Sequence, residues 1–272
     1  MVTSPRVLVT LEGYAVEGGF DRPYEPATCY SPTIALGRHA GPGRADQLWR
    51  DYEAVLDLVP ALGVDGVRLG VEWARVEPRR GQVDTSALER YAKVVTHARA
   101  LELAVTLVVV DAVWPSWLGL EAWLLPWVAP HVVTHARRLA AHFDDPAVRL
   151  VLFAQPEEMV SRGFLDATAP PWRRGAREDA RSAREQIAGI SETLRADRDV
   201  GPRLVAAHRT ISLALPDDEL RAARDEAQHC EEMYVRSLVR GAGPTSAPAG
   251  LLVQHGEQWR TGVAIEALAA LR

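Results

Sequence analysis

Short β-like runs alternate with longer helical patterns along most of this 272-residue chain. The β-like runs are Arg6–Leu11, Gly66–Trp73, Ala104–Val110, Val148–Ala154, Leu204–His208 and Leu251–Gln254. The helical patterns are Asp46–Leu62, Ser86–Leu101, a segment ending near Phe143, Glu178–Arg198, Asp217–Val239 and Glu257–Leu271. This alternation predicts an α/β fold with about six parallel βα units, in a single domain over residues 1–272.

Composition argues against several classes of protein. Hydrophobic residues make up 47% of the chain and charged residues 25%, as in an ordinary globular domain. The net charge of -5 and the lack of a basic stripe argue against nucleic-acid binding. The N-terminus does not resemble a signal peptide, and every apolar stretch is too short or too interrupted to span a membrane. We therefore expect a cytoplasmic protein without membrane contact.

Cysteine and histidine spacing gives little reason to expect a metal. Cys29 and Cys230 lie far apart in the sequence and fit ordinary reduced thiols. His131 and His135 have the i, i+4 spacing of metal ligands, but no third ligand or following acid supports such a site. We expect neither a metal nor another cofactor.

Two apolar runs end in glutamine. Val151–Phe153 is followed by Ala154 and Gln155, and Leu251–Val253 is followed by Gln254 and His255. An inner strand of a barrel delivers a polar side chain to a pocket in this way. Both glutamines are therefore candidate site residues.

Several motifs together resemble glycoside hydrolase family 1, the β-glucosidase family. Tyr14–Gly18 is similar to the family's Tyr-Gln-Ile-Glu-Gly on the first strand. Leu62–Arg68 and Glu72–Pro78 are similar to its second-strand signature, in which an Arg precedes Ser-Trp-Ser-Arg-Ile-x-Pro. Val105–Asp111 is similar to Val-Thr-Leu-Tyr-His-Trp-Asp on the third strand.

The resemblance implies a TIM (β/α)8-like barrel. It is incomplete here, because the family's sixth and eighth strands have no counterpart. The family's acid/base glutamate falls on Gln155. Its nucleophile falls on Gln254 when the chains are aligned on Gly256, on His255 after a one-residue slip, or in a deleted region if this segment is the family's C-terminal tail.

Two glutamines at these positions are incompatible with the family's usual reaction. A retaining glycosidase needs two carboxyl groups roughly 5 Å apart, one to donate a proton and one to attack carbon. An amide does neither well, although it forms hydrogen bonds both ways. Plant myrosinases of the family also have Gln at the acid/base position, but they keep the nucleophile. The family's sugar contacts are lost too, at Ala15, Val109 and Ala154.

Charged residues near the first two strands could supply other chemistry. Strand alternation puts Arg68 and Glu72 on one face of strand two, and the resemblance places Arg68 inside the barrel beside the nucleophile position. Glu72 is either the partner of Arg68 or Arg75, or an acid or base in the pocket. Glu17 is likewise either structural or ligand-binding.

Other candidates follow later strands. Asp111 fits a residue that bonds backbone after strand three, or a ligand contact. Glu157 belongs either to a solvated loop or to the pocket. His208 and Arg209 end strand five and are candidate pocket residues, as is His255. Of the tryptophans, Trp73 and Trp114 are interpreted first as core or rim aromatics and second as sugar-stacking surfaces.

Four functions stay open. The first is a pseudoglycosidase whose pocket binds a sugar-like or polyol small molecule. The second is a non-hydrolytic isomerase, cyclase or lyase that uses Glu72, His208 or His255 for proton transfer. The third is a scaffold, in which a partner or a second copy covers barrel edges left open by the missing strands. The fourth is a residual β-glycosidase.

Overall fold

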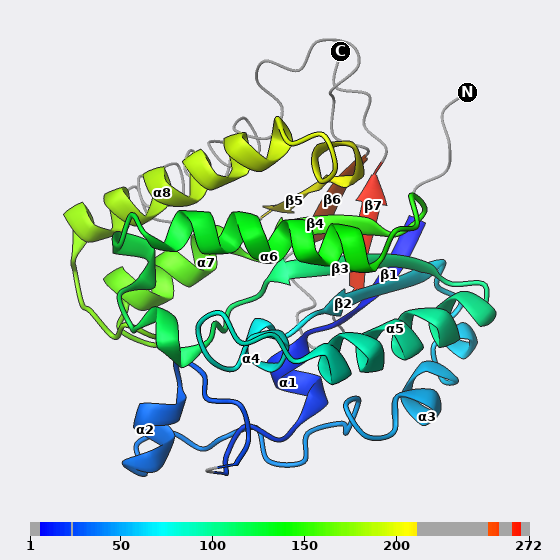
Figure 1. The fold of residues 1–272 in the computed structure, drawn as a ribbon, viewed down its shortest axis with the longest axis horizontal. Coiled ribbons are helices and arrows are strands. Elements are labelled where there is room, and N and C mark those ends of the chain that lie inside the picture. Colours follow the sequence, from blue (N-terminus) through cyan, green and yellow to red (C-terminus); the bar gives the residue numbers. More distant parts are fainter. Residues whose placement is uncertain (1–5, 23, 211–249, 256–262, 268–272) are drawn as a thin grey trace, which may run out of the picture.

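The computed structural model describes residues 6–22, 24–210, 250–255 and 263–267, with backbone alone for residue 6 and for the strand residues after 205 (Figure 1). The strands are β1 (Arg6–Leu11), β2 (Gly66–Gly70), β3 (Ala104–Val110), β4 (Arg149–Phe153), β5 (Val205–Thr210), β6 (Gly250–His255) and β7 (Val263–Ala267). The α-helices are α1 (Gly13–Glu17), α2 (Ser31–Ala35), α3 (Tyr52–Leu56), α4 (Trp73–Val76), α5 (Thr85–Ala100), α6 (Val128–His142), α7 (Pro156–Val160) and α8 (Arg177–Arg195). Short turns of other helix types are η1 (Pro60–Leu62), η2 (Ser116–Leu118), η3 (Ala122–Leu124), η4 (Ser161–Leu165) and η5 (Gly201–Arg203).

The strands form one sheet in the order β4-β3-β2-β1-β7-β6-β5. Neighbours from β1 to β4 are parallel, and so are β5 and β6. A parallel bridge from Leu150 to Leu204 brings the two outer strands together, so the sheet curls toward a ring. This is an incomplete α/β barrel, as the sequence predicts.

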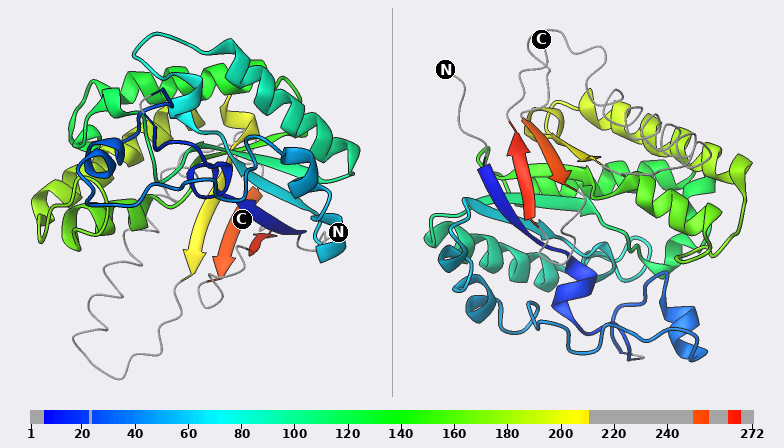
Figure 2. Two further views of the ribbon diagram at one scale, coloured as in Figure 1. Left: turned by 90° about the horizontal axis from the view of Figure 1, so that it is seen from below. Right: turned by 180° about the vertical axis from the view of Figure 1, so that it is seen from behind.

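The last strand is a difference from the sequence prediction. Residues 263–267, which the sequence analysis assigned to a helix over Glu257–Leu271, form β7 instead. This strand is antiparallel to both β1 and β6 and lies between them (Figure 2). Val263 and Ile265 are β-branched residues at a spacing of two, which suits a strand. Because β7 pairs on both sides, the open edge expected there is filled. The helix expected over Asp217–Val239 lies outside the described residues.

Other helices and strands begin or end at different residues from those predicted, because the backbone turns sooner than the periodicity of the sequence suggests. The helix expected over Asp46–Leu62 shrinks to α3 and η1, since Gln47 has a φ of 61°, which no right-handed helix allows. The strand expected to reach Trp73 ends at Gly70 and is followed by α4. Helix α5 is capped by Asp84, whose Oδ1 accepts from the Ala87 N–H at 3.1 Å, rather than by Ser86.

Side-chain alternation divides the core in two. One face of the sheet, with Leu69, Leu107 and Leu150, packs under the helices in a large hydrophobic cluster. Figure 1 shows α5, α6 and α8 over this face. A small cluster lies on the opposite, inner face and consists of Leu8, Val108, Val151, Ala154 and Val205. The barrel interior is therefore apolar at this level.

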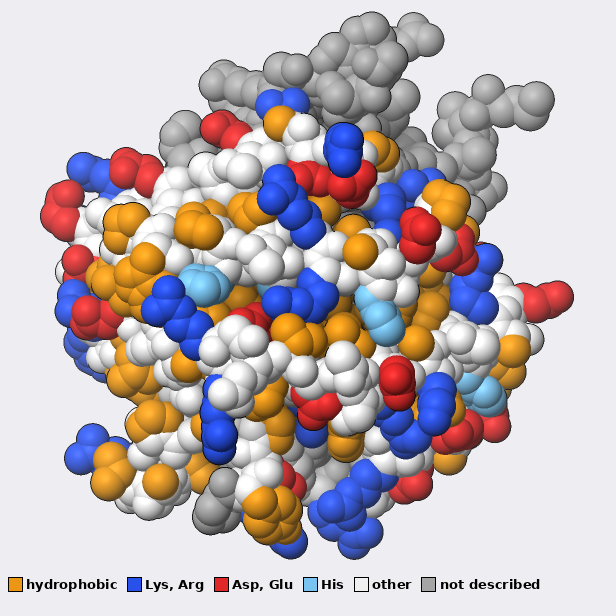
Figure 3. Space-filling view, viewed as in Figure 1, with side chains coloured by type: hydrophobic (Ala, Val, Ile, Leu, Met, Phe, Trp, Pro, Cys, Tyr) orange, Lys and Arg blue, Asp and Glu red, His pale blue; other side chains and the backbone are white. Residues whose placement is uncertain are grey.

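The surface mixes charges of both signs. In Figure 3, basic and acidic side chains are interspersed over the face in view. Among the described helices, none has both the length and the apolar character needed to cross a bilayer.

Close approach of β2 to β3 requires glycine at position 66. A Cβ there would lie 2.3 Å from the backbone oxygen of Ala104, which has no freedom to move. We expect Gly66→Ala to lower the free energy of unfolding by about 1–3 kcal/mol, the usual cost of overpacking. Gly189→Ala is the matched control, because a Cβ there meets nothing within 4 Å and alanine favours helix α8. Urea denaturation of both variants checks this, and equal stabilities would contradict it.

Candidate functional site

The carboxyl ends of β1 to β4 meet at one edge of the sheet and carry polar side chains. Glu12 follows β1, Arg68 lies in β2, Asp111 follows β3 and Gln155 follows β4. We call these four residues the mouth cluster. Ligand sites of parallel barrels are built at this edge, from residues on several strands.

Arg68 is buried at the centre of the cluster. Its side chain is 1% exposed, and its Nε and Nη2 atoms have no hydrogen-bond partner among the described residues. Burial lowers the pKa of Arg68, while the charges of Asp111 and Glu12 oppose that change. A buried donor without an acceptor costs free energy, so this guanidinium is suited to an acceptor brought by a ligand or by water.

Glu12 is the member that the sequence analysis did not single out. It is half-buried, and its Oε1 lies 3.5 Å from Gln155 Nε2, which donates to it. Burial, followed by the charge of Asp111, raises its pKa to about 7 against the opposing charge of Arg68. The signal was present, because Glu12 is a polar residue that ends an apolar strand, just as Gln155 does.

Asp111 holds the backbone at the end of β3. Its Oδ1 accepts from the Ala112 N–H at 2.8 Å, which is the structural role expected for it. Burial raises its pKa, opposed by that hydrogen bond and by the charge of Arg68.

Glu72 does not form the expected pair with Arg68 or Arg75. Its Oε1 accepts from the Tyr14 N–H at 2.7 Å, because β2 has already ended and the chain is turning into α4. Its side chain fills the space over Gly13, where a Cβ would lie 2.6 Å from Glu72 Cγ. Burial, then the charges of Glu17 and Asp111, raises the pKa of Glu72 well above its usual value.

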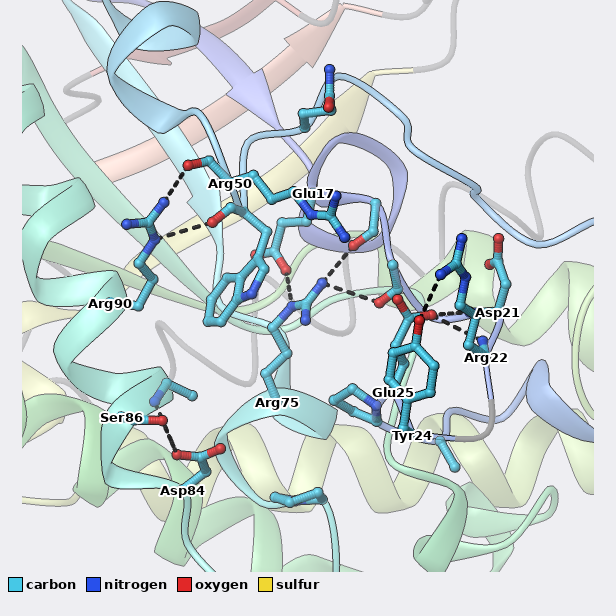
Figure 4. Close-up of a pocket in the computed structure, with 18 of the residues that line it drawn as sticks. Glu17, Asp21, Arg22, Tyr24, Glu25, Arg50, Arg75, Asp84, Ser86 and Arg90 are labelled. Atoms are coloured by element: carbon cyan, nitrogen blue, oxygen red, sulfur yellow. Dashed lines mark hydrogen bonds and ion pairs between the residues drawn. The ribbon is translucent and has the colours of Figure 1, made fainter.

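Glu17 and Arg75 form a buried ion pair that ties α1 to α4. Arg75 Nε donates to Glu17 Oε2 at 2.6 Å, and the Tyr91 hydroxyl donates to Glu17 Oε1 at 2.6 Å. The guanidinium also lies 4.2 Å from the ring centres of Phe20 and Trp49. Figure 4 shows Arg75 pointing toward Glu17 among the side chains that line a cavity. Glu17 is therefore structural.

That cavity has a volume of about 1290 Å³, and no residue of the mouth cluster lines it. Its acidic side chains order the loops. Asp21 accepts from the Gly43 N–H, and Glu25 accepts from the backbone of Asp21 and Arg22. Arg90 donates to the backbone oxygens of Trp49 and Arg50 (Figure 4). Most polar groups of this cavity thus hold the surrounding loops together. Arg68 in the mouth cluster, in contrast, has hydrogen-bond donors without acceptors among the described residues.

Known β-glucosidases are similar to this chain in sequence. Beta-glucosidase 47 of Arabidopsis thaliana is 29% identical over 164 residues, which cover 59% of this chain and 30% of that protein. Beta-glucosidase-like SFR2 of rice is 25% identical over 131 residues, which cover 46% of this chain and 20% of that protein. The aligned part is therefore less than a third of each relative. No family model matches the chain.

Solved structures of glycosidases share the fold. A beta-glycosidase from Pyrococcus horikoshii superposes with a TM-score of 0.69 at 16% identity, covering 95% of this chain and 65% of that one. Fpglu1 from Fervidobacterium pennivoraus superposes with a TM-score of 0.72 at 16% identity, covering 91% of this chain and 61% of that one. The chain is a divergent glycoside hydrolase family 1-like protein.

Trp73 and Trp114, the two candidate sugar-stacking tryptophans, belong to the core. Trp73 is 1% exposed and stacks on His135 with ring centres 4.7 Å apart, deep between sheet and helices. Trp114 is equally buried, and its Nε1 donates to the Gly119 oxygen at 2.8 Å. In this arrangement neither ring is available for stacking on a sugar.

Glu157 differs from the solvated loop residue that the sequence suggested. It is buried and paired with Arg184, whose Nε lies 2.9 Å from Glu157 Oε2, and Ser161 donates to its other oxygen. Helix α7 begins directly after Gln155, which turns Glu157 toward α8. It holds two helices together and does not belong to the mouth cluster.

Four candidates lie in strands whose side chains are outside the described residues. His208 and Arg209 are in β5, and Gln254 and His255 are in β6, with Arg209 paired in register with Gln254. Among the described residues, no group of three His, Cys, Asp or Glu side chains could hold a metal ion.

Removing Arg75 tests the ion pair. We expect Arg75→Ala to lower the free energy of unfolding by about 3–5 kcal/mol, because it leaves Glu17 buried without a counter-charge. The control is Arg137→Ala, whose pair with Asp197 has a largely exposed arginine and should cost under about 1 kcal/mol. Chemical denaturation measures both, and similar losses would contradict the structural role of Glu17.

Glu12 should make stability depend on pH. Its pKa is near 4.5 when unfolded and about 7 when folded, so its favourable contribution is complete below about 4.5 and is lost as pH rises through 7. We expect the unfolding midpoint of Glu12→Gln to rise relative to that of wild type as the pH increases from 5 to 8. The exposed carboxyl variant Glu89→Gln should follow wild type. A constant difference across this range would refute the raised pKa.

Proposed function

We propose that the mouth cluster binds a sugar-like or polyol small molecule and that the chain has lost retaining-glycosidase chemistry. The observation that carries the proposal is the buried guanidinium of Arg68, whose Nε and Nη2 have no acceptor among the described residues. Hydroxyl oxygens are such acceptors. Gln155 and Glu12 next to it can both donate and accept, as recognition of a polyhydroxy ligand requires.

The loss of hydrolysis is argued from the chemistry of the amide. The resemblance puts the family's acid/base at Gln155 and its nucleophile at Gln254, at His255 or in a deleted region, and none of these supplies a carboxyl group. A double displacement needs both groups. Glu157, which follows Gln155 closely, does not stand in for the acid, because it is held by Arg184.

A second candidate is a non-hydrolytic enzyme that works by proton transfer. Glu12 favours it, because a half-buried carboxyl with a pKa of about 7 is matched to acid–base work near neutral pH. Glu72 is a poorer base than the sequence suggested, since it is buried and accepts from the Tyr14 N–H.

The first test is hydrolysis of a panel of activated aryl β-glycosides by the purified protein across pH, with binding of sugars and polyols followed by ligand-observed NMR. We expect binding without turnover. Turnover that survives stringent purification would mean that a carboxyl pair exists and would overturn the proposal. A lack of any binding would overturn its first half.

Restoring the two carboxyl groups should not restore a glycosidase. We expect the double variant Gln155→Glu, Gln254→Glu to stay without strong activity on the same substrates. The family's sugar contacts are still absent, with Ala15 exposed to solvent and Val109 buried on the helix side of the sheet. Robust turnover by the double variant, with the single variants as controls, would contradict this.

A further inference from the structure

Glu12 is the carboxyl of the mouth cluster best placed to reach a ligand. Asp111 accepts a hydrogen bond from the backbone N–H of Ala112. Glu72, which is outside the cluster, accepts one from the Tyr14 N–H. Glu12 is half-buried and bound only by the long contact with Gln155 among the hydrogen bonds of the described residues.

Arg68 supplies the complementary group. Its two unpartnered nitrogens, Nε and Nη2, lie on one edge of the planar guanidinium and point their protons the same way. Arg68 is paired in register with Thr10 of the neighbouring strand β1, two residues before Glu12, so the two groups start from adjoining positions at this edge of the sheet. A fixed cation with open donors, shielded from water, is the arrangement that stabilises an oxyanion as it forms.

We propose that Glu12 is the acid–base residue of this site and acts on the open-chain hydroxy-carbonyl form of the sugar-like ligand, with Arg68 stabilising the oxyanion. This rests on the proposed function, because the ligand must first occupy the mouth cluster. A hydroxy-carbonyl substrate fits better than a glycoside. Proton abstraction beside a carbonyl needs one reachable base and one cation, whereas glycoside hydrolysis needs two reachable carboxyls.

The reaction needs no other reactant. The Glu12 carboxylate takes the proton from the carbon beside the carbonyl, and the electrons of that C–H bond form a carbon–carbon double bond. The carbonyl π electrons move to oxygen, and the resulting oxyanion accepts hydrogen bonds from Arg68 Nε and Nη2. Glu12 then returns a proton to the same carbon. If a hydroxyl proton first shifts from one oxygen of the intermediate to the other, Glu12 returns its proton to the neighbouring carbon instead. The carbonyl and hydroxyl groups then exchange places, so the ligand is isomerised.

The charges around Glu12 set the pH dependence. The described groups that act on it are Asp111 and Glu158, which raise its pKa, and Arg68 and Arg162, which lower it, while burial has the largest effect and raises it. Because the base form is the carboxylate, the rate of proton abstraction should rise with pH through about 7 and then level off.

The experiment is solvent exchange. Dihydroxyacetone and D-fructose are incubated with the full chain in D2O, and loss of the proton signal beside the carbonyl is followed by NMR across pH. Wild type should accelerate exchange over buffer, and Glu12→Gln should reduce that acceleration by about 10²–10⁴-fold, the usual contribution of an acid–base residue. Glu89→Gln, an exposed carboxyl on α5, should behave as wild type. Saturation-transfer NMR on the same samples reports binding.

Each outcome decides between the two proposals. Binding without exchange, or exchange that Glu12→Gln leaves unchanged, overturns the role of Glu12 and leaves the binding function standing. No binding by wild type to these or other sugars and polyols overturns the proposed function itself. If Glu12→Gln fails to fold, Glu12→Asp keeps the carboxyl, and a pH profile identical to wild type in that variant would also overturn the inference.

Discussion

The buried pair of Glu17 and Arg75 fixes the part of the molecule on which the site depends. Arg75 is held at once by the Glu17 carboxylate, by the backbone oxygens of Gly18 and Gly19, and by two aromatic rings. The segment after β1 is thereby joined to the segment after β2. Glu12 directly follows β1 and Arg68 lies in β2, so the same pair helps to fix the segments that carry the half-buried carboxyl and the buried cation.

Negative charge is in excess around this edge of the sheet. Glu12, Glu17, Glu72 and Asp111 surround Arg68 and Arg75, and burial raises the pKa of all four carboxyls. Three of them are tied to backbone or to Arg75, so their protons are out of reach. Only Glu12 combines a raised pKa with exposure, which is why acid–base chemistry can be located at a single residue.

Sequence reasoning found β1 to β6, assigned the residues of β7 to a helix, and missed what happens where the strands end. Alternation of apolar residues placed β1, β3 and β4 to within a residue, because buried strands leave a strong periodic signal. It failed for Glu72, since alternation was continued past Gly70, where the backbone turns into α4. It failed for Glu157, because the partner Arg184 lies on a distant helix. Glu12 was overlooked since the resemblance directed attention to the family's own glutamate positions.

The amide at position 155 and the carboxyl at position 12 depend on each other. Gln155 is neutral and donates to Glu12 from 3.5 Å, which stabilises the carboxylate without adding charge. A glutamate in its place would put a further negative charge at this distance, and like charges raise one another's pKa. Glu12 would then be protonated well above neutral pH and could not act as a base there. In the function proposed here, the glutamine at the position of the family's acid/base is thus also the residue that allows Glu12, after a different strand, to ionise near pH 7.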